Sequence, residues 1–107
     1  MPEQPSGAYK VCCAKKDLEQ LKLLATKATS LGIRQEFLTA LKVINHKLTF
    51  DPLTWGDPQY RGSGLGLLFC HGLYSFLHVY YAVSEERRLV FVKEFLPLPN
   101  SPLGKDG

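Results

Sequence analysis

The spacing of apolar residues changes once along this chain, from a helical period to the alternation of a β-strand. Between Lys15 and His46, apolar residues recur every three or four positions, which is typical of amphipathic helices. From Leu67 to Leu96, aromatic and β-branched residues are abundant, and these types favour strands. Helices followed by strands in 107 residues predict a single domain of the α+β class.

The first half of the chain is predicted to form one short strand and two helices. Tyr9–Cys13 is the strand, residues 15–30 form the first helix and residues 34–46 the second. Only Gly32-Ile33 separates the helices, which indicates an antiparallel helix hairpin. The predicted apolar stripes consist of Leu18, Leu21, Ala25 and Ala28 on the first helix, and of Phe37, Leu38, Leu41, Ile44 and Leu48 on the second.

Three further strands are predicted at residues 67–71, 75–83 and 88–96, with turns at 72–73 and 84–87. Connections this short predict an antiparallel meander. Alternation along the central strand places one set of side chains against the helices, namely Leu77, Val79, Tyr81 and Val83. The other face carries Phe76, His78, Tyr80 and Ala82. We interpret that face as either a second small core or a binding surface.

Residues 49–66 are predicted to be a long connection, because they contain two Asp-Pro pairs and a glycine-rich run. Loops of this length are often functional, and Trp55 and Tyr60 are expected to hold it against the body. The proline-containing ends, residues 1–7 and 97–107, are predicted to be flexible tails. The predicted domain therefore spans residues 8–96.

Basic residues are concentrated in the first half of the chain. Residues 1–50 contain eight lysines and arginines against four acidic residues, whereas residues 51–107 contain five against six. The lysines of the first helix fall away from its apolar stripe. This basic surface is either a solvated helix face or a contact surface for nucleic acid or an acidic polypeptide.

Three cysteines without a C-x-x-C pair argue against a disulfide framework or a zinc ribbon. Cys70 and His71 are neighbours on a predicted strand, so their side chains point to opposite faces. We therefore expect free thiols and a cytoplasmic location, and we predict no metal or other cofactor. No signal-peptide pattern and no run of about 18 apolar residues is found, so we expect no membrane segment.

The order of strand, two helices, Asp-Pro loop and three-stranded meander resembles the RelE/ParE superfamily of toxin–antitoxin systems, also known from plasmid stabilisation. Residues 15–21 (KKDLEQL) look like the start of the family's first helix, and Phe50-Asp51-Pro52 matches its D-P after the second helix. Residues 72–83 (GLYSFLHVYYAV) are similar to its G-x-Y-R-V-x-Y strand. The resemblance implies a divergent β-α-α-β-β-β protein with both helices on one face of an antiparallel-rich sheet.

RelE-like members cut ribosome-bound mRNA by attack of a ribose 2′-hydroxyl on the adjacent phosphate. This chemistry requires cations and an acid–base pair. The resemblance aligns the family's strand arginine with His78 and its strand tyrosine with Tyr81. The candidate catalytic residues for this chain are His78, Arg61, Tyr80 and Lys93.

The family's usual ending, His-Arg followed by tyrosine, is replaced here by residues 93–97 (KEFLP). Ribonuclease activity therefore stays open, beside a catalytically inert interaction module and a gyrase-directed inhibitor of the ParE type. Without catalysis, His78 would be a packed histidine and Arg61 a solvated loop residue. The implied partner is an antitoxin segment that wraps the helix hairpin or a sheet edge and complements the basic helices.

Overall fold

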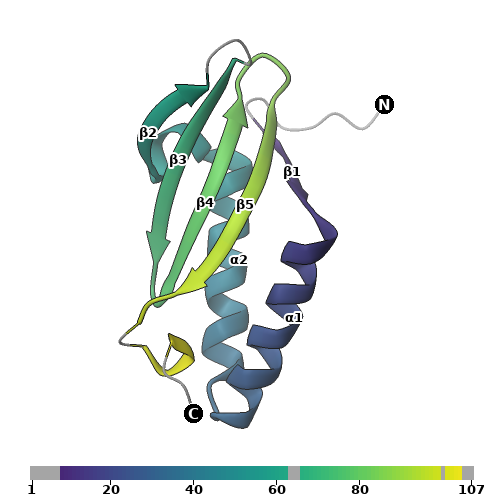
Figure 1. Cartoon of the computed structure of the whole chain (residues 1–107), viewed down its shortest axis with the longest axis vertical. Coiled ribbons are helices and arrows are strands. Elements are labelled where there is room, and N and C mark those ends of the chain that lie inside the picture. The colour runs from purple at the N-terminus through teal and green to yellow at the C-terminus, as the bar shows by residue number, and fades with distance from the viewer. Residues whose placement is uncertain (1–7, 63–65, 100, 105–107) are drawn as a thin grey trace.

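The computed structural model describes residues 8–62, 66–99 and 101–104, so the predicted tail 1–7 lies outside the described residues. Within this part, no helix combines the length and the apolar character needed to cross a bilayer. The elements, shown in Figure 1, are β1 (Lys10–Cys13), α1 (Lys15–Ser30), α2 (Arg34–Phe50), α3 (Pro52–Trp55), β2 (Asp57–Gly62), β3 (Leu67–Tyr74), β4 (Leu77–Ser84), β5 (Leu89–Pro97) and the 3-10 turn η1 (Pro102–Gly104).

One five-stranded sheet has the order β1-β5-β4-β3-β2. The strands β2 to β5 pair antiparallel with their chain neighbours, which confirms the predicted meander. The first strand pairs parallel with the last, from Lys10 opposite Leu89 to Cys13 opposite Val92. The α1–α2 hairpin between β1 and β2 returns the chain to the far side of the sheet, and the fold is α+β.

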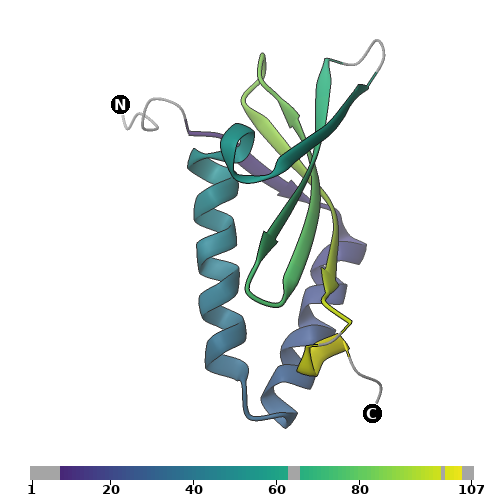
Figure 2. The same ribbon diagram turned by 90° about the vertical axis from the view of Figure 1, so that its left-hand side faces the viewer.

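The helix hairpin packs against one face of the sheet, and α2 passes behind the strands in Figure 1. The two helices are joined at their lower ends by a short link (Figure 2). Leu21, Leu41 and Val79 belong to a single apolar cluster, as the predicted stripes require. The inward set of β4 is also confirmed, since Leu77, Val79, Tyr81 and Val83 are all buried.

The start of the α1 stripe differs from the prediction. Leu18 is 47% exposed, whereas Leu24 is buried. The stripe consists of Leu21, Leu24, Ala25 and Ala28, which is the i, i+3, i+4, i+7 spacing of one helix face. Asp17, rather than Leu18, is the buried residue of the first turn, and it lines a cleft shared with β5.

The prediction that residues 49–66 form a long loop is wrong over most of this range. α2 continues to Phe50 because Leu48 extends its buried face. Pro52 then begins α3, where a missing N–H costs nothing in the first turn. Residues 57–62 form the edge strand β2, which pairs with β3. Trp55 packs against the core as predicted, with its ring 5.8 Å from that of Tyr81.

The turn predicted at Gly72-Leu73 is also wrong, since β3 runs through both residues to Tyr74. The chain reverses at Ser75-Phe76, with Ser75 in the left-handed region at φ 56°. Gly72 serves close packing instead. A Cβ atom at this position would come within 2.5 Å of the Trp55 ring.

The segment predicted as a flexible C-terminal tail is partly folded. β5 includes Pro97, and η1 places Leu103 in the core at 2% exposure. The Lys27 ammonium donates a hydrogen bond to the Leu103 carbonyl at 2.9 Å, and the Ser101 hydroxyl donates to that of Leu98 at 2.6 Å. An apolar anchor and local hydrogen bonds therefore hold this segment against α1, despite its proline-rich composition.

Candidate functional site

The sheet face opposite the helices carries the second, unusual set of side chains. His71 and Phe69 project there from β3, and they lie opposite Tyr80 and Ala82 of β4. Residues directly opposite in an antiparallel pair share a face. Of the aromatic residues that alternation predicted for this face, Tyr80 is present, whereas Phe76 lies before β4 and packs against the core. The strand β3 contributes Phe69 and His71. We call this face the outer face.

Two β-bulges flank the middle of the outer face. The register between β2 and β3 shifts between Pro58 and Tyr60, which leaves Gln59 as the extra residue. The register between β4 and β5 shifts at Tyr80/Tyr81, which leaves Lys93 as the extra residue. Bulges redirect side chains and are frequent beside active sites. Here each bulge adds one polar side chain to the same area.

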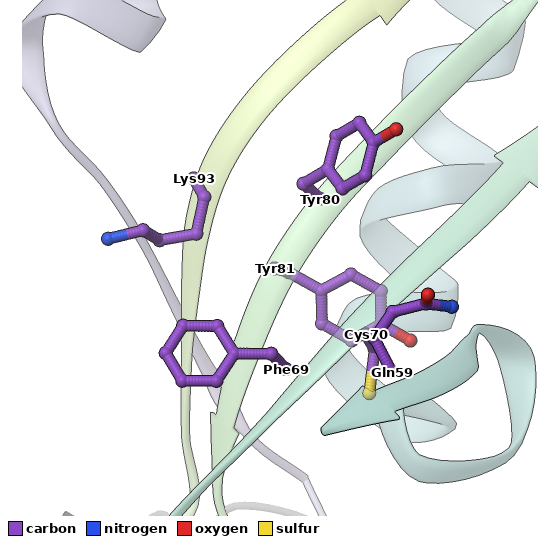
Figure 3. Close-up of a pocket in the computed structure, with 6 residues that line it drawn as sticks. All are labelled: Gln59, Phe69, Cys70, Tyr80, Tyr81 and Lys93. Carbon is purple, nitrogen blue, oxygen red and sulfur yellow. The ribbon is translucent and has the colours of Figure 1, made fainter. Parts of the chain in front are cut away.

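A cavity of about 460 Å³ lies between these bulges. Figure 3 shows its lining residues, which come from four adjacent strands. In that view, the Lys93 ammonium and the Tyr80 hydroxyl extend to opposite sides. The lining residues are Gln59, Phe69, Cys70, Tyr80, Tyr81 and Lys93. The cavity therefore combines two aromatic rings of the outer face with one cation.

A short hydrogen bond joins two histidines beside this cavity. His71 Nε2 and His78 Nδ1 are 2.6 Å apart, and either ring can be the donor. The ring of His71 also stacks on Tyr80, with centroids 4.6 Å apart and planes inclined by 10°. Tyr80 is thus shared by the cavity and by the histidine pair.

The strand register extends this arrangement into a row across the outer face. Asp57 of β2 lies opposite His71, which lies opposite Tyr80, which lies opposite Glu94 of β5. His78 belongs to the next row, between Leu73 and Leu96. The first row therefore has a carboxylate residue at each end.

The candidate catalytic residues separate into two places. Tyr80 and Lys93 line the same cavity, and His78 is linked to Tyr80 through His71. Arg61 lies elsewhere. It pairs with Leu68 of β3, whereas His78 pairs with Leu73, which is five residues further along the same strand. That separation corresponds to roughly 16 Å of strand. The Arg61 guanidinium forms an exposed ion pair with Glu85 at 3.2 Å.

Tyr81, which the resemblance aligned with the family's strand tyrosine, is a structural residue. Its hydroxyl donates a hydrogen bond to the Pro52 carbonyl at 2.6 Å and accepts one from the Gly56 N–H at 3.0 Å. Burial raises the pKa of Tyr81 far above its usual range, and nearby Cys70 adds to the effect. This tyrosine therefore stays neutral and fastens α3 to β4.

The cysteines and histidines do not assemble a metal centre. In the part of the chain that the structure describes, no three His, Cys, Asp or Glu side chains converge to hold a metal ion. Cys70 points into the core at 2% exposure, and burial raises the pKa of its thiol. Burial also raises the pKa of the Cys13 thiol, with a further contribution from Asp17.

Sequence reasoning missed three contributors to the outer face: Phe69, His71 and Gln59. Phe69 and His71 alternate on β3 with the buried Cys70, so period-2 alternation on that strand was a usable signal. Gln59 had no such signal, because its position depends on a bulge in a strand that the Asp-Pro pairs concealed.

Comparisons with known proteins place the fold. No family model and no curated protein matches the chain. Among solved structures, the chain is similar to one chain of the "Crystal structure of archaeal RelE-RelB complex from Pyrococcus horikoshii OT3". The match has a TM-score of 0.56 at 16% identity and covers 88% of this chain and 99% of the other. The chain therefore shares a RelE-like fold with that structure at low sequence identity, in agreement with the fold that the resemblance implied.

Proposed function

We propose, from its RelE-like fold, that this chain is a toxin, or a toxin-derived protein, of a toxin–antitoxin system. The observation that carries the proposal is the structural match over 88% of the chain to one chain of a RelE–RelB complex. In this proposal the protein acts in the cytoplasm, and a second polypeptide binds it and restrains its activity.

The surface proposed for the antitoxin is the helix hairpin. An apolar cleft of about 180 Å³ opens between the hairpin and the strands β1 and β5, and its lining includes Leu21, Leu41 and Phe95. The helices also expose Lys22 and Lys42 to solvent. An acidic amphipathic segment would place apolar side chains in the cleft and carboxylates near the lysines.

The target proposed for the outer face is single-stranded RNA, presented as mRNA on the ribosome. Phe69 and Tyr80 offer rings on which unstacked bases can lie, and Lys93 offers a cation for the backbone. His78, on the same face, is then the proposed acid–base group.

An inert interaction module is the second candidate, and the position of Arg61 favours it. In-line attack on a phosphodiester develops negative charge that cations must stabilise. Arg61 is held by Glu85 away from His78, and Lys93 is the nearest candidate cation in the cavity. With the outer face unable to catalyse, the helix hairpin could still bind its partner.

Induced expression tests the toxin proposal. Expression is expected to arrest growth, and co-expression of a small acidic protein encoded next to the gene is expected to relieve the arrest. Relief should weaken in each of Lys22→Glu and Lys42→Glu and persist in Arg87→Glu, a matched single charge reversal in the β4–β5 turn. Harmless expression would favour the inert module.

A ribosome-dependent cleavage assay with purified protein tests the RNA proposal. Wild-type protein is expected to cut mRNA on programmed ribosomes, and Lys93→Gln is expected to cut it about 10² to 10³ times more slowly. Lys42→Gln, which removes an exposed lysine from α2, serves as the control. Equal rates for both variants would remove Lys93 from the site.

A further inference from the structure

The hydrogen bond between His71 and His78 allows a proton to pass from one ring to the other, which neither histidine could do alone. The rings come from neighbouring strands, their centroids are 4.6 Å apart, and Nε2 of His71 is 2.6 Å from Nδ1 of His78. The stack on Tyr80 fixes the plane of the His71 ring. Their two other nitrogens, His71 Nδ1 and His78 Nε2, are here called the far nitrogens.

The proton count of the pair decides what the far nitrogens can do. A neutral imidazole carries one proton, on one of its two nitrogens. The ring that donates the bridging proton therefore has an unprotonated far nitrogen. The ring that accepts the bridge carries its own proton on its far nitrogen. Whichever ring donates, the neutral pair presents one base and one acid at its two ends.

A proton can pass through this pair without creating a lasting charge. The unprotonated far nitrogen takes up a proton, the bridging proton moves across the 2.6 Å gap, and the second far nitrogen releases its proton. The pair ends neutral, and both rings have changed to their other tautomer. A reverse transfer through water restores the starting state.

We propose that His71 and His78 act together as the acid–base relay of the outer face, an inference that rests on the proposed RNA target. The base end removes the proton of a ribose 2′-hydroxyl while its oxygen bonds to phosphorus. The acid end protonates the 5′-oxygen as its bond to phosphorus breaks. The products are a 2′,3′-cyclic phosphate and a 5′-hydroxyl, so no oxidant, reductant or further reactant is consumed.

Charged residues of the flanking strands lie near the pair. Asp57 lies opposite His71 on β2, and Glu94 of β5 lies opposite Tyr80. Lys93, the extra residue of the β5 bulge, adds a cation on the same side of the sheet. A second proton would occupy the base end and stop the relay. The rate should therefore fall on the acid side only, whereas two independent histidines would give a bell-shaped profile.

The first arm of the test uses ribosome-dependent cleavage by the full-length chain. His71→Gln, His78→Gln and the double variant are each expected to lose about 100-fold in kcat, because members of a working unit are not additive. His71→Phe, which retains a ring to stack on Tyr80 but cannot bridge, should lose as much. His46→Gln, an exposed histidine of α2, is the control and should retain the wild-type rate. If the loss in kcat of the double variant equals the product of the two single losses, the relay would be overturned.

The second arm does not require activity. Nitrogen-15 NMR of the free protein should show the same tautomer for His71 and His78, both Nε2–H or both Nδ1–H, and the two should change together as pH is lowered. His71→Gln should abolish the single tautomer of His78. Independent tautomers and independent titration would overturn the pair. Absence of cleavage by the wild type would refute the proposed RNA target, and this NMR arm would then still decide for or against the coupled pair.

Discussion

The indole ring of Trp55 occupies the space in which a side chain at position 72 would stand. A Cβ atom added to Gly72 would come within 2.5 Å of the ring. Trp55 is the last residue of the short helix α3, and Gly72 lies near the end of β3. This contact joins the segment after α2 to the sheet and determines how β2 approaches β3.

Gly72→Ala is therefore expected to destabilise the fold by about 1–3 kcal/mol, because the added methyl group overpacks a filled site. Urea unfolding followed by circular dichroism would measure the change in both backgrounds used below, because Trp55 is the only tryptophan in the sequence. In a Trp55→Leu background the same substitution should cost much less, since the smaller side chain leaves room. Equal costs in both backgrounds would show that the ring is not the obstacle.

Tyr81→Phe is expected to cost about 1–3 kcal/mol, because the Pro52 carbonyl and the Gly56 N–H lose their buried partner. Tyr80→Phe, at a position that is 37% exposed, is the matched control. It should change stability by no more than about 0.5 kcal/mol. Similar effects at both positions would contradict the structural role assigned to Tyr81.

The raised pKa of Tyr81 also predicts a loss of stability in alkali. The unfolded chain releases this proton near the ordinary tyrosine pKa of about 10, whereas the folded chain retains it. Above that pH the folded state binds more protons, so the free energy of unfolding falls by up to about 1.4 kcal/mol per pH unit. Below it, Tyr81 makes no pH-dependent contribution. The difference between wild type and Tyr81→Phe between pH 9 and about pH 11.5 isolates this residue.

Leu103→Ala is expected to cost about 2 kcal/mol or more, because the side chain is 2% exposed and packed in the core. A flexible tail would give no effect. Leu23→Ala provides the comparison, since Leu23 is 68% exposed on α1 and should be close to neutral. Thermal unfolding of the two variants under identical conditions would separate an anchored segment from a loose one.

Arg61→Gln should change stability by less than about 1 kcal/mol, because its ion pair with Glu85 is exposed on both sides. The same variant should retain the cleavage rate of the wild type, since Arg61 does not line the cavity between the bulges and its guanidinium is paired with Glu85. A large loss of rate with an intact fold would return Arg61 to the catalytic residues and extend the site along the sheet.

Local patterns in the sequence determined which segments are helical and which are extended. The apolar stripes of α1 and α2 depend on residues one or two helical turns apart, and the alternation of β4 depends on residues of one strand. These patterns can therefore be recognised in the sequence without knowledge of the fold. The same alternation placed His78 and Tyr80 together on the outer face. Overlapping turn signals were less reliable, as Gly72 and the Asp-Pro pairs demonstrate.

Only the tertiary structure decided what those segments meet. The partner of His78, the shared cavity of Tyr80 and Lys93, and the separation of Arg61 all depend on strand register and on two bulges. The burial of Leu24 instead of Leu18 depends on how α1 is rotated against the sheet. The register of the strands and the rotation of α1 are set by packing between residues that are distant in sequence. The sequence around any one of these residues does not indicate which distant residues it contacts.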